Sequence, residues 1–316
     1  MMISVLGHVF CLYSLLCFTG AQENQLPRHH HMHIHGVMAP FIFPQLYRCP
    51  ISPSQIVTAN ETHSQANEDF WLFEQIFSKL PMEEQIGGTF LEIGALDGIV
   101  FSNSWFFEKK FGWKGILVEG HPLNQADLRR GLDQKRIRDN VAAFTAAICP
   151  LVDGAPGELL FTKIAGGVGT ALNTTSKAFL DFWHKGDAGA FKTACVPMQM
   201  IIESTNLLDI DLFSLDVEGG ELYILQTINF NVTNIRVIVV ENDGHSPEKD
   251  DAVRALLKEK GFVNAEPTYG NIRDRCPNPR GWGCPSNEVY INPNYDKMSR
   301  KKNLVHYQYG TGTKCN

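Results

Sequence analysis

The sequence has little positive charge, and it lacks several motifs that point to common functions. Its 28 lysine and arginine residues are outnumbered by 34 aspartate and glutamate residues, giving a net charge of -6. Because nucleic-acid-binding proteins usually carry a basic footprint, we expect no nucleic-acid partner. No Cys-x-x-Cys pair occurs, which argues against a structural zinc site. Neither Gly-x-Gly-x-x-Gly nor a phosphate-binding Lys-Ser or Lys-Thr loop is present, which disfavours ligands that carry a pyrophosphate.

Long apolar runs are also scarce, and the one exception covers Ile3 to Phe18. Small residues follow up to Ala21, so we interpret residues 1–21 as a secretory signal peptide, although its first residues include no Lys or Arg. An uncleaved anchor is the alternative, but a bilayer span needs roughly 20 apolar residues. No other transmembrane segment is predicted. We expect secretion or residence in the endoplasmic reticulum or Golgi lumen, in agreement with the glycosylation sequons at Asn60, Asn173 and Asn231.

Six cysteines lie outside the predicted signal peptide, and an even number in a secretory chain fits disulfide bonds. The pair Cys276–Cys284 is expected first, because these residues flank a Pro/Gly-rich loop. Cys149 and Cys195 lie at the edges of two predicted strands and are the second expected pair, which leaves Cys49 with Cys315. Reduced thiols in the core are the alternative.

Residues 22–63 are rich in His and Pro, and we interpret them as a linker or an irregular arm. Between His29 and His35 they place five imidazoles in seven residues, a set that could bind Zn²⁺ or Cu²⁺. We favour a flexible polar segment without a resident metal, because no rigid scaffold is evident that would fix the ligand geometry.

Strand and helix patterns alternate over residues 64–293, which predicts an α/β domain with a mainly parallel sheet and helices on both faces. Residues 294–316 are interpreted as a C-terminal tail. The predicted strands are Thr89–Ile93, Gly115–Glu119, Ala142–Ile148, Leu212–Val217, Val237–Glu241 and Val289–Ile291. The predicted helices are Ser64–Leu80, Ser102–Phe111, Pro122–Leu132, Leu222–Ile228 and Asp250–Lys260. Gly154–Thr175 breaks the alternation and is typical of an inserted hairpin or active-site flap.

Acidic or polar residues end several of the predicted strands, and the first such strand is followed by Gly94 and Gly98. Because parallel strands end at one rim of a sheet, these side chains are expected to converge on a ligand cleft. A carboxylate at Glu119 can accept hydrogen bonds from both hydroxyls of a ribose. Helix capping is the alternative role for such residues. The set comprises Glu92, Glu119, Asp216, Glu218, Glu241, Asn242 and Asp243.

Four motifs occur in a fixed order: Ser64-Gln-x-x-Glu-Asp69, Phe90-Leu-Glu-Ile-Gly-Ala-x-Asp-Gly98 with Ser102-Asn-Ser104, Val118-Glu119, and Leu215-Asp-Val-Glu-Gly-Gly-Glu221. Together they resemble the FkbM-type methyltransferases over about Ser64 to Asn292. The resemblance implies a class I, Rossmann-like methyltransferase fold that binds S-adenosylmethionine and usually methylates oxygen, with sugar or polyketide hydroxyls among the acceptors. One departure is Gly120-His-Pro after Glu119, where such proteins often have Pro and an acidic residue.

The resemblance also implies roles for individual residues. Asp216 would lie beside the transferring methyl group, and Asn103 would bind the methionine carboxylate. The general base is left open among Asp216, Glu218, His121 and His245. A second route uses Mg²⁺ or Ca²⁺ held by Asp216, Glu241 and Asn242, similar to the ligands of catechol-type O-methyltransferases. The residues expected at the cofactor are Glu92, Gly94, Ala95, Asp97, Ser102, Asn103 and Glu119.

The leading hypothesis from sequence is an O-methyltransferase of the secretory pathway that acts on hydroxyls of a glycan or glycoconjugate. One alternative is a catalytically silent interaction or trafficking protein of the same fold, which the retention of Glu92, Gly94 and Asp216 disfavours. Another is a methyltransferase for a small hydroxylated molecule. The acceptor and the oligomeric state stay open. Four aromatic residues are candidates for stacking on a sugar, although core packing is their commoner role: Trp105, Phe106, Phe182 and Trp183.

Overall fold

The computed structural model describes residues 31–32, 61–135, 138–185, 189, 191–275 and 286–295. The predicted signal peptide, the predicted pairs Cys276–Cys284 and Cys49–Cys315, the tail after residue 295 and most of the His/Pro-rich arm lie outside these described residues. Within the described part of the chain, no helix has both the length and the apolar character needed to cross a membrane.

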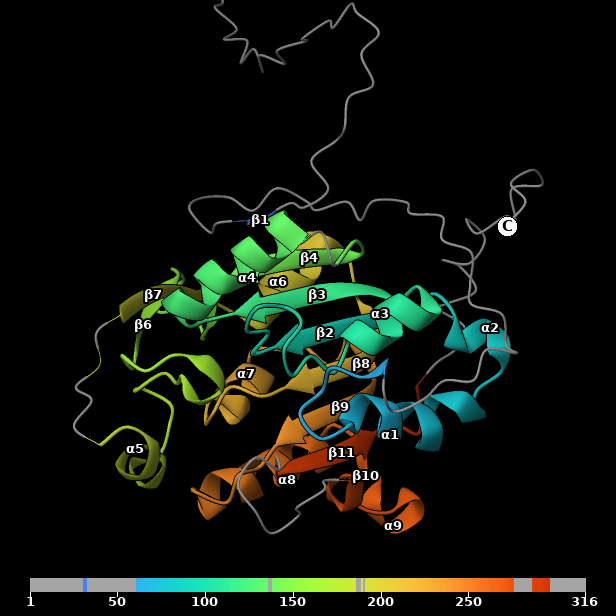
Figure 1. Ribbon diagram of the computed structural model, residues 1–316. Helices are drawn as coiled ribbons and strands as arrows, with labels where there is room; N and C mark the ends of the chain where they lie inside the picture. Colours follow the sequence, from blue (N-terminus) through green and yellow to red (C-terminus); the bar gives the residue numbers. More distant parts are fainter. Residues whose placement is uncertain are drawn as a thin grey trace, which may run out of the picture.

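The helices and strands alternate along most of the described chain (Figure 1). The strands are β1 (His31–Met32), β2 (Thr89–Ile93), β3 (Lys114–Glu119), β4 (Val141–Thr145), β5 (Ala147–Ile148), β6 (Gly157–Phe161), β7 (Phe191–Val196), β8 (Asp209–Leu215), β9 (Asn234–Glu241), β10 (Val263–Asn264) and β11 (Asn287–Ile291). The α-helices are α1 (Glu68–Gln75), α2 (Met82–Gln85), α3 (Trp105–Phe111), α4 (Pro122–Lys135), α5 (Lys177–Trp183), α6 (Met198–Thr205), α7 (Glu221–Gln226), α8 (Pro247–Glu259) and α9 (Glu266–Tyr269).

The central sheet has the strand order β1-β4-β3-β2-β8-β9-β11-β10. Strands β4, β3, β2, β8 and β9 run parallel to one another, and β11 pairs antiparallel with β9. The chain winds outward from β2 in one direction and, after returning to β8, in the other. The boundary between β2 and β8 is therefore the switch point, where open α/β sheets place their ligands. This is the class I methyltransferase fold that the sequence predicts.

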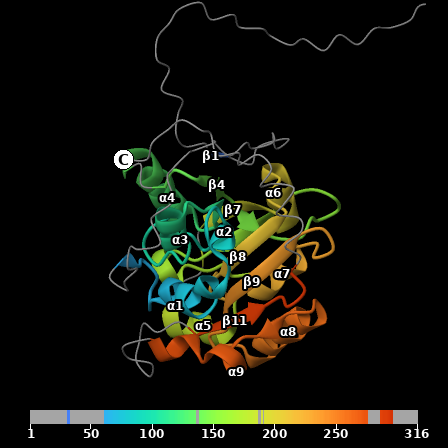
Figure 2. The same ribbon diagram turned by 90° about the vertical axis from the view of Figure 1, so that its right-hand side faces the viewer.

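Helices cover both faces of this sheet, with α1, α3 and α4 on one side and α6, α7 and α8 on the other (Figure 2). The strands are apolar because they are buried on both faces, and their side chains alternate between the two cores. Leu91 and Ile93 of β2 point into the core under α6, α7 and α8. Phe90, the residue before Leu91, points to the opposite face of the sheet and belongs to the same core cluster as Phe106 and Phe107 of α3.

A second, three-stranded sheet has the order β5-β7-β6. The sequence predicts one strand over Ala142–Ile148, but the structure divides this stretch into β4, in the central sheet, and β5, which pairs with β7. That prediction was wrong because the chain changes partner strands at Ala146. A disulfide bond joins Cys149 to Cys195, so the second expected cysteine pair is confirmed. It ties the end of β5 to β7 in this small sheet.

Two predicted helices begin later in the structure than in the sequence analysis. The segment from Ser64 does not become helical until Glu68, because Ser64 donates its hydroxyl to Asp69 and Asn67 has a left-handed φ of 62°. The helix expected from Ser102 begins at Trp105. In both places buried carboxylates bind the preceding residues and hold them out of the helix.

Candidate active site

A cavity of about 630 Å³ opens at the carboxyl ends of the central strands. Its volume lies within the roughly 300–1,000 Å³ that is typical of small-molecule sites. Side chains that follow β2, β3, β8 and β9 line it, together with residues from the small sheet and from α5. The lining includes Glu92, Gly94, Asn103, Glu119, Asp216, Glu218, Glu241, Asp243 and His245. The structure therefore brings together most of the residues that the sequence singles out.

The backbone at the end of β2 forms the centre of this cavity. The N–H groups of Gly94 and Ala95 both donate to the carbonyl oxygen of Val118, at 3.0 and 3.1 Å. On the other side, the N–H of Asp216 donates to the carbonyl of Ile93 at 3.2 Å. These bonds continue the pairing of the three strands beyond their last residues and hold the turn after β2 at the cavity wall.

Glu92 is buried, and its carboxylate binds the loop before α3. It accepts hydrogen bonds from the hydroxyls of Ser102 and Ser104 and, at 2.7 Å, from the N–H of Asn103. The Asn103 amide donates to the Ser214 hydroxyl at 2.9 Å, while its own side-chain oxygen is buried without a hydrogen-bond partner. Glu92 thus positions Asn103 at the cavity, and both of its carboxylate oxygens accept hydrogen bonds from the protein itself.

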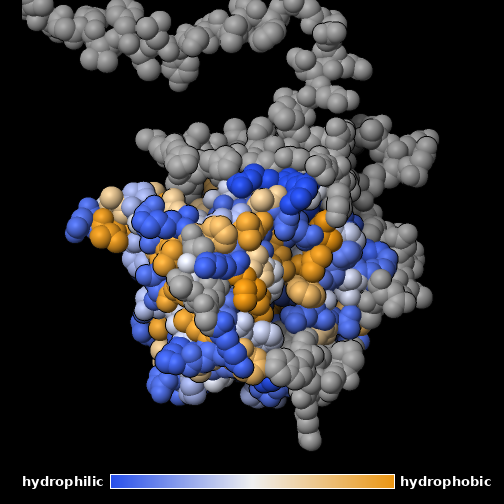
Figure 3. Space-filling view, turned by 60° about the vertical axis from the view of Figure 1, so that its left-hand side comes forward, coloured by the Kyte–Doolittle hydropathy of each residue, from blue (hydrophilic) through white to orange (hydrophobic). Residues whose placement is uncertain are grey.

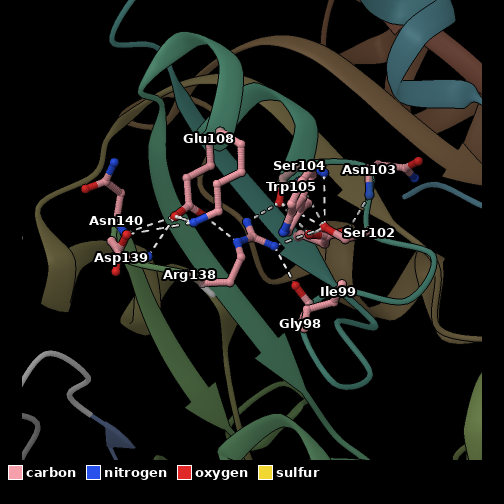
Figure 4. A network of polar contacts seen from close by, with 12 residues as sticks. Gly98, Ile99, Ser102, Asn103, Ser104, Trp105, Glu108, Arg138, Asp139 and Asn140 are labelled. Carbon is pink, nitrogen blue, oxygen red and sulfur yellow. Dashed lines mark hydrogen bonds and ion pairs between the residues drawn. The ribbon is translucent and has the colours of Figure 1, made fainter. Parts of the chain in front are cut away.

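Arg138 binds the same loop through its guanidinium group (Figure 4). Its guanidinium is fully buried, forms an ion pair with Glu108, and donates to the carbonyl of Gly98 at 2.7 Å. It also donates to the hydroxyls of Ser102 and Ser104, at 3.1 and 2.9 Å. A planar guanidinium with five donors can make all these bonds at once, and a lysine cannot. Sequence analysis did not single out this arginine.

Glu119 ends β3 with its carboxylate buried at the cavity wall. Its two oxygens accept from the N–H of Leu96 at 2.9 Å and from the N–H of His121 at 2.7 Å. Burial raises the pKa of this carboxyl to about 7, although these backbone donors oppose the rise. The position at the end of the second strand from the switch point is where a ribose-binding carboxylate is expected.

Three carboxyl groups meet at the far end of the cavity: those of Asp216, Glu218 and Glu241, with oxygens within 4.8 Å of one another. Burial raises the pKa of Asp216 to about 7 and that of Glu218 to about 10, and it also raises the pKa of Glu241. A hydrogen bond between Asp216 and Glu241 lowers the pKa of the first and raises that of the second. This hydrogen bond therefore favours a protonated Glu241 that donates to Asp216.

Other predicted site residues lie further from the cavity. His121 is buried, with one ring nitrogen on the Thr162 carbonyl and the other accepting from the N–H of Leu123, and it is not part of the lining. Asp97 accepts from two backbone N–H groups of its own turn. Ala95, Ser102 and Asn242 are buried outside the lining, whereas His245 is part of it.

The sequence matches the family description "Methyltransferase FkbM domain" over residues 92–263. The chain belongs to the FkbM family of S-adenosylmethionine-dependent methyltransferases. The match runs from the end of β2 through β9 and α8, and it includes every cavity residue discussed above. No curated protein sequence matches this FkbM methyltransferase.

Several solved methyltransferase structures are similar to this chain at low sequence identity. The FkbM methyltransferase from Methylobacillus flagellatus KT is 12% identical, covers 66% of this chain and 44% of its own, and has a TM-score of 0.34. The O-methyltransferase from Bacillus cereus, in complex with SAH, is 11% identical over 75% of this chain and 82% of its own, with a TM-score of 0.35. Precorrin-6y C5,15-methyltransferase from Geobacter metallireducens GS-15 is 14% identical over 60% of this chain and 69% of its own, with a TM-score of 0.31.

S-adenosylmethionine fits the residues of this FkbM methyltransferase. The cofactor carries a cationic sulfonium, and the cavity lining contains carboxylates but no Lys or Arg among the described residues. The buried, unpartnered oxygen of Asn103 offers a further polar contact. Sequence analysis missed Gln65 and Asn124, which also line the cavity. Asn124 exchanges two hydrogen bonds with Gly166 and so ties the glycine-rich segment 166–170, here named the Gly-rich flap, to α4. No local sequence pattern predicts this contact between distant segments.

Proposed function

We propose that this FkbM methyltransferase is an O-methyltransferase of the secretory pathway that methylates a sugar hydroxyl of a glycan or glycoconjugate. The observation that carries the chemistry is the position of Asp216, a half-buried carboxyl group that directly follows β8 and lies beside Gly94 at the switch point. The Cys149–Cys195 disulfide supports an oxidising compartment. The sequon asparagines Asn173 and Asn231 are exposed, as glycan carriers need to be.

Asp216 is our choice as general base among the candidates that the sequence left open. Its pKa of about 7 matches the operating pH, which is the condition for efficient proton transfer. Burial and the neighbouring Asp216 also raise the pKa values of Glu218 and Glu241, which favours their protonated forms and leaves Asp216 as the acceptor. His121 lies outside the lining with both ring nitrogens bonded, so it is poorly placed to touch an acceptor.

The reaction then needs one proton transfer and one displacement. Bound S-adenosylmethionine supplies a methyl group on its sulfonium sulfur. Asp216 would take the proton of the acceptor hydroxyl, so that the oxygen can receive the methyl group that the sulfonium gives up. Much of the rate would come from alignment, because an in-line displacement depends on holding the reacting atoms in contact. Glu119 and Asn103 would hold the ribose and methionine ends of the cofactor in that alignment.

A divalent cation is the second route to an activated hydroxyl. The structure places Glu218 with Asp216 and Glu241, whereas Asn242 is buried outside the cavity lining. Oxygen ligands of this kind suit Mg²⁺ or Ca²⁺. We expect methyl transfer to persist in EDTA, because the raised pKa of Asp216 already supplies a base near neutral pH. Activity that disappears in EDTA and returns with Mg²⁺ would establish the metal route instead.

The first experiment is a calorimetric titration of S-adenosylmethionine into the full chain, expressed through a eukaryotic secretory pathway, beside Glu119→Ala. We expect micromolar binding that weakens at least tenfold in the variant. Transfer of labelled methyl from the cofactor to glycans then tests the acceptor. A folded protein that binds no cofactor would favour the silent interaction protein, and binding with transfer only to small non-sugar hydroxyls would favour the small-molecule enzyme.

A further inference from the structure

Helix α5 places two aromatic side chains at the cavity mouth. Phe182 and Trp183 are 44% and 37% exposed, and both line the cavity. Their rings contact edge to face, with centroids 5.0 Å apart. Behind them the ring of Phe179 is buried and packs against His245 at 5.6 Å. We name Phe182 and Trp183 the aromatic shelf.

The aromatic shelf is fixed at both ends of its helix. The Ser176 hydroxyl accepts from the N–H of Phe179 at 3.1 Å and donates to the His245 carbonyl at 3.2 Å, which ties the start of α5 to the loop after β9. At the other end, the His184 ring bonds the Val168 carbonyl at 2.7 Å and so ties α5 to the Gly-rich flap. A rigid aromatic surface loses little conformational entropy when it binds a ligand.

The position of the shelf separates it from the other aromatic residues that the sequence singled out. Phe106 is fully buried in the core, and Trp105 packs against His63 at 4.0 Å. Only Phe182 and Trp183, of these four, line the cavity. The core-packing alternative therefore accounts for Phe106. The rings of the aromatic shelf contact His245 and Phe179 on one side and stay partly exposed at the cavity on the other.

The cavity beside the shelf carries charge of one sign. Among the described residues, its lining has no Lys and no Arg, and it has six acidic residues: Glu92, Glu119, Asp216, Glu218, Glu241 and Asp243. The nearby Lys249 lies outside the lining and pairs with Glu221 at 3.3 Å. A phosphate, sulfate or carboxylate on the acceptor would find no Lys or Arg in this lining to pair with. The lining carboxyl groups that are ionised would repel it, and the protonated Glu218 and Glu241 would not offset its charge.

We propose that the aromatic shelf is the acceptor subsite, and that it binds a sugar ring that bears no anionic group. One face of the ring lies on Trp183 or Phe182, and its hydroxyl points toward Asp216. A sugar ring has an apolar face and a polar edge, which matches an aromatic surface beside carboxylates. This inference rests on the proposed function and adds to it the subsite and the charge of the acceptor.

The test measures transfer of labelled methyl to an array that prints neutral glycans beside their sialylated, sulfated and uronic-acid counterparts. We expect label on neutral glycans and at least tenfold less on the counterparts with the charge next to the accepting sugar. Trp183→Ala and Phe182→Ala should raise the KM for the best neutral glycan at least tenfold and leave the Kd for S-adenosylmethionine within twofold. Tyr223→Ala is the matched control, because Tyr223 is 41% exposed and lies outside the cavity lining. It should change neither constant.

Each outcome separates this inference from the function on which it rests. Label that prefers anionic glycans, or an unchanged KM in both shelf variants, would overturn the subsite and leave a glycan methyltransferase. Cofactor binding without label on any glycan would overturn the sugar acceptor and the subsite together. A folded protein that binds no S-adenosylmethionine would overturn the proposed function itself.

Discussion

The carbonyl oxygen of Asp216 lies so close to Gly94 that a β-carbon on Gly94 would be 1.8 Å from it. Gly94 also has a φ of 87°, which disfavours other residues. The ends of β2 and β8 therefore meet at a point that only glycine permits. Because the backbone of Asp216 itself makes this contact, backbone packing places its carboxyl group relative to the loop after β2.

Gly94→Ala is expected to abolish cofactor binding. The added methyl group would have to push apart two backbone segments that cannot move independently of the sheet. Gly154→Ala is the matched control, because Gly154 has a similar φ of 78° but no atom within 4 Å of its added β-carbon. We expect the control to lose about 1–2 kcal/mol of unfolding free energy and to keep its affinity. The Gly94 variant should lose at least 100-fold in affinity by calorimetry, and equal behaviour of the two would contradict this account.

Cofactor binding is expected to strengthen as pH rises toward 7. Burial holds the pKa of Asp216 at about 7, so this carboxyl is protonated in the free protein at lower pH. A cationic sulfonium favours the ionised form, so binding must release the proton. The affinity should increase by up to about tenfold per pH unit below 7 for each proton released, and level off above it. Charged groups that influence Asp216 or its partner Glu218 are Glu68, Glu221, Asp243, Glu241 and Lys249.

Calorimetry in two buffers of different ionisation enthalpy counts the released protons. Glu119, whose pKa is also about 7, contributes with the same sign. Asp216→Asn should reduce the number of protons released and make the cofactor affinity depend less on pH. The affinity for S-adenosylhomocysteine, which lacks the sulfonium charge, should also depend less on pH. An affinity that is independent of pH between 5.5 and 8 would show that these carboxyl groups do not respond to the cofactor.

The sequence predicted the central sheet because its strands are short apolar runs that end in acidic residues. Glu92, Glu119, Asp216 and Glu241 all reach the cavity region, since parallel strands end at one rim. The family resemblance predicted the fold, and both the fold and the family are confirmed. Strand β5 was misplaced, because a change of partner strand leaves no local signal in an apolar stretch.

Contacts between distant segments account for the rest of what the sequence could not show. Arg138 follows no motif, yet it holds Ser102 and Ser104 from 36 and 34 residues away. Helix α5 is only 7 residues long and was not predicted. The role proposed for Trp183 depends on its exposure at the cavity, and a hydrophobic pattern cannot distinguish an exposed ring from one in the core.

Arg138→Met is expected to destabilise the protein more than removal of both partners of its ion pair. The single change removes the buried counter-charge of Glu108 and leaves it only the less buried Lys109, at 3.5 Å. Loss of a buried ion-pair partner typically costs about 3–5 kcal/mol. Adding Glu108→Gln removes that charge while an amide oxygen can still accept from the N–H groups of Asp139 and Asn140. Urea unfolding should therefore show the double variant to be more stable than Arg138→Met alone. A double variant that is less stable would mean that Glu108 stabilises the fold without Arg138.

Loss of the Cys149–Cys195 disulfide is expected to destabilise the fold and to loosen one wall of the cavity. The bond closes a loop with a sequence separation of 46 residues, for which the chain-entropy estimate is about 4 kcal/mol. The double variant Cys149→Ser, Cys195→Ser should have a free energy of unfolding that is lower by about this amount when measured by urea titration.

The same bond lies next to the cavity, because Ala147 and Ile148 of β5, which directly precede Cys149, line it. At a temperature well below its Tm, the folded variant should therefore have a higher KM for the acceptor. The Kd for the cofactor, which Glu119 is expected to bind, should change less. An unchanged KM would show that pairing of β5 with β7 holds this wall without the disulfide.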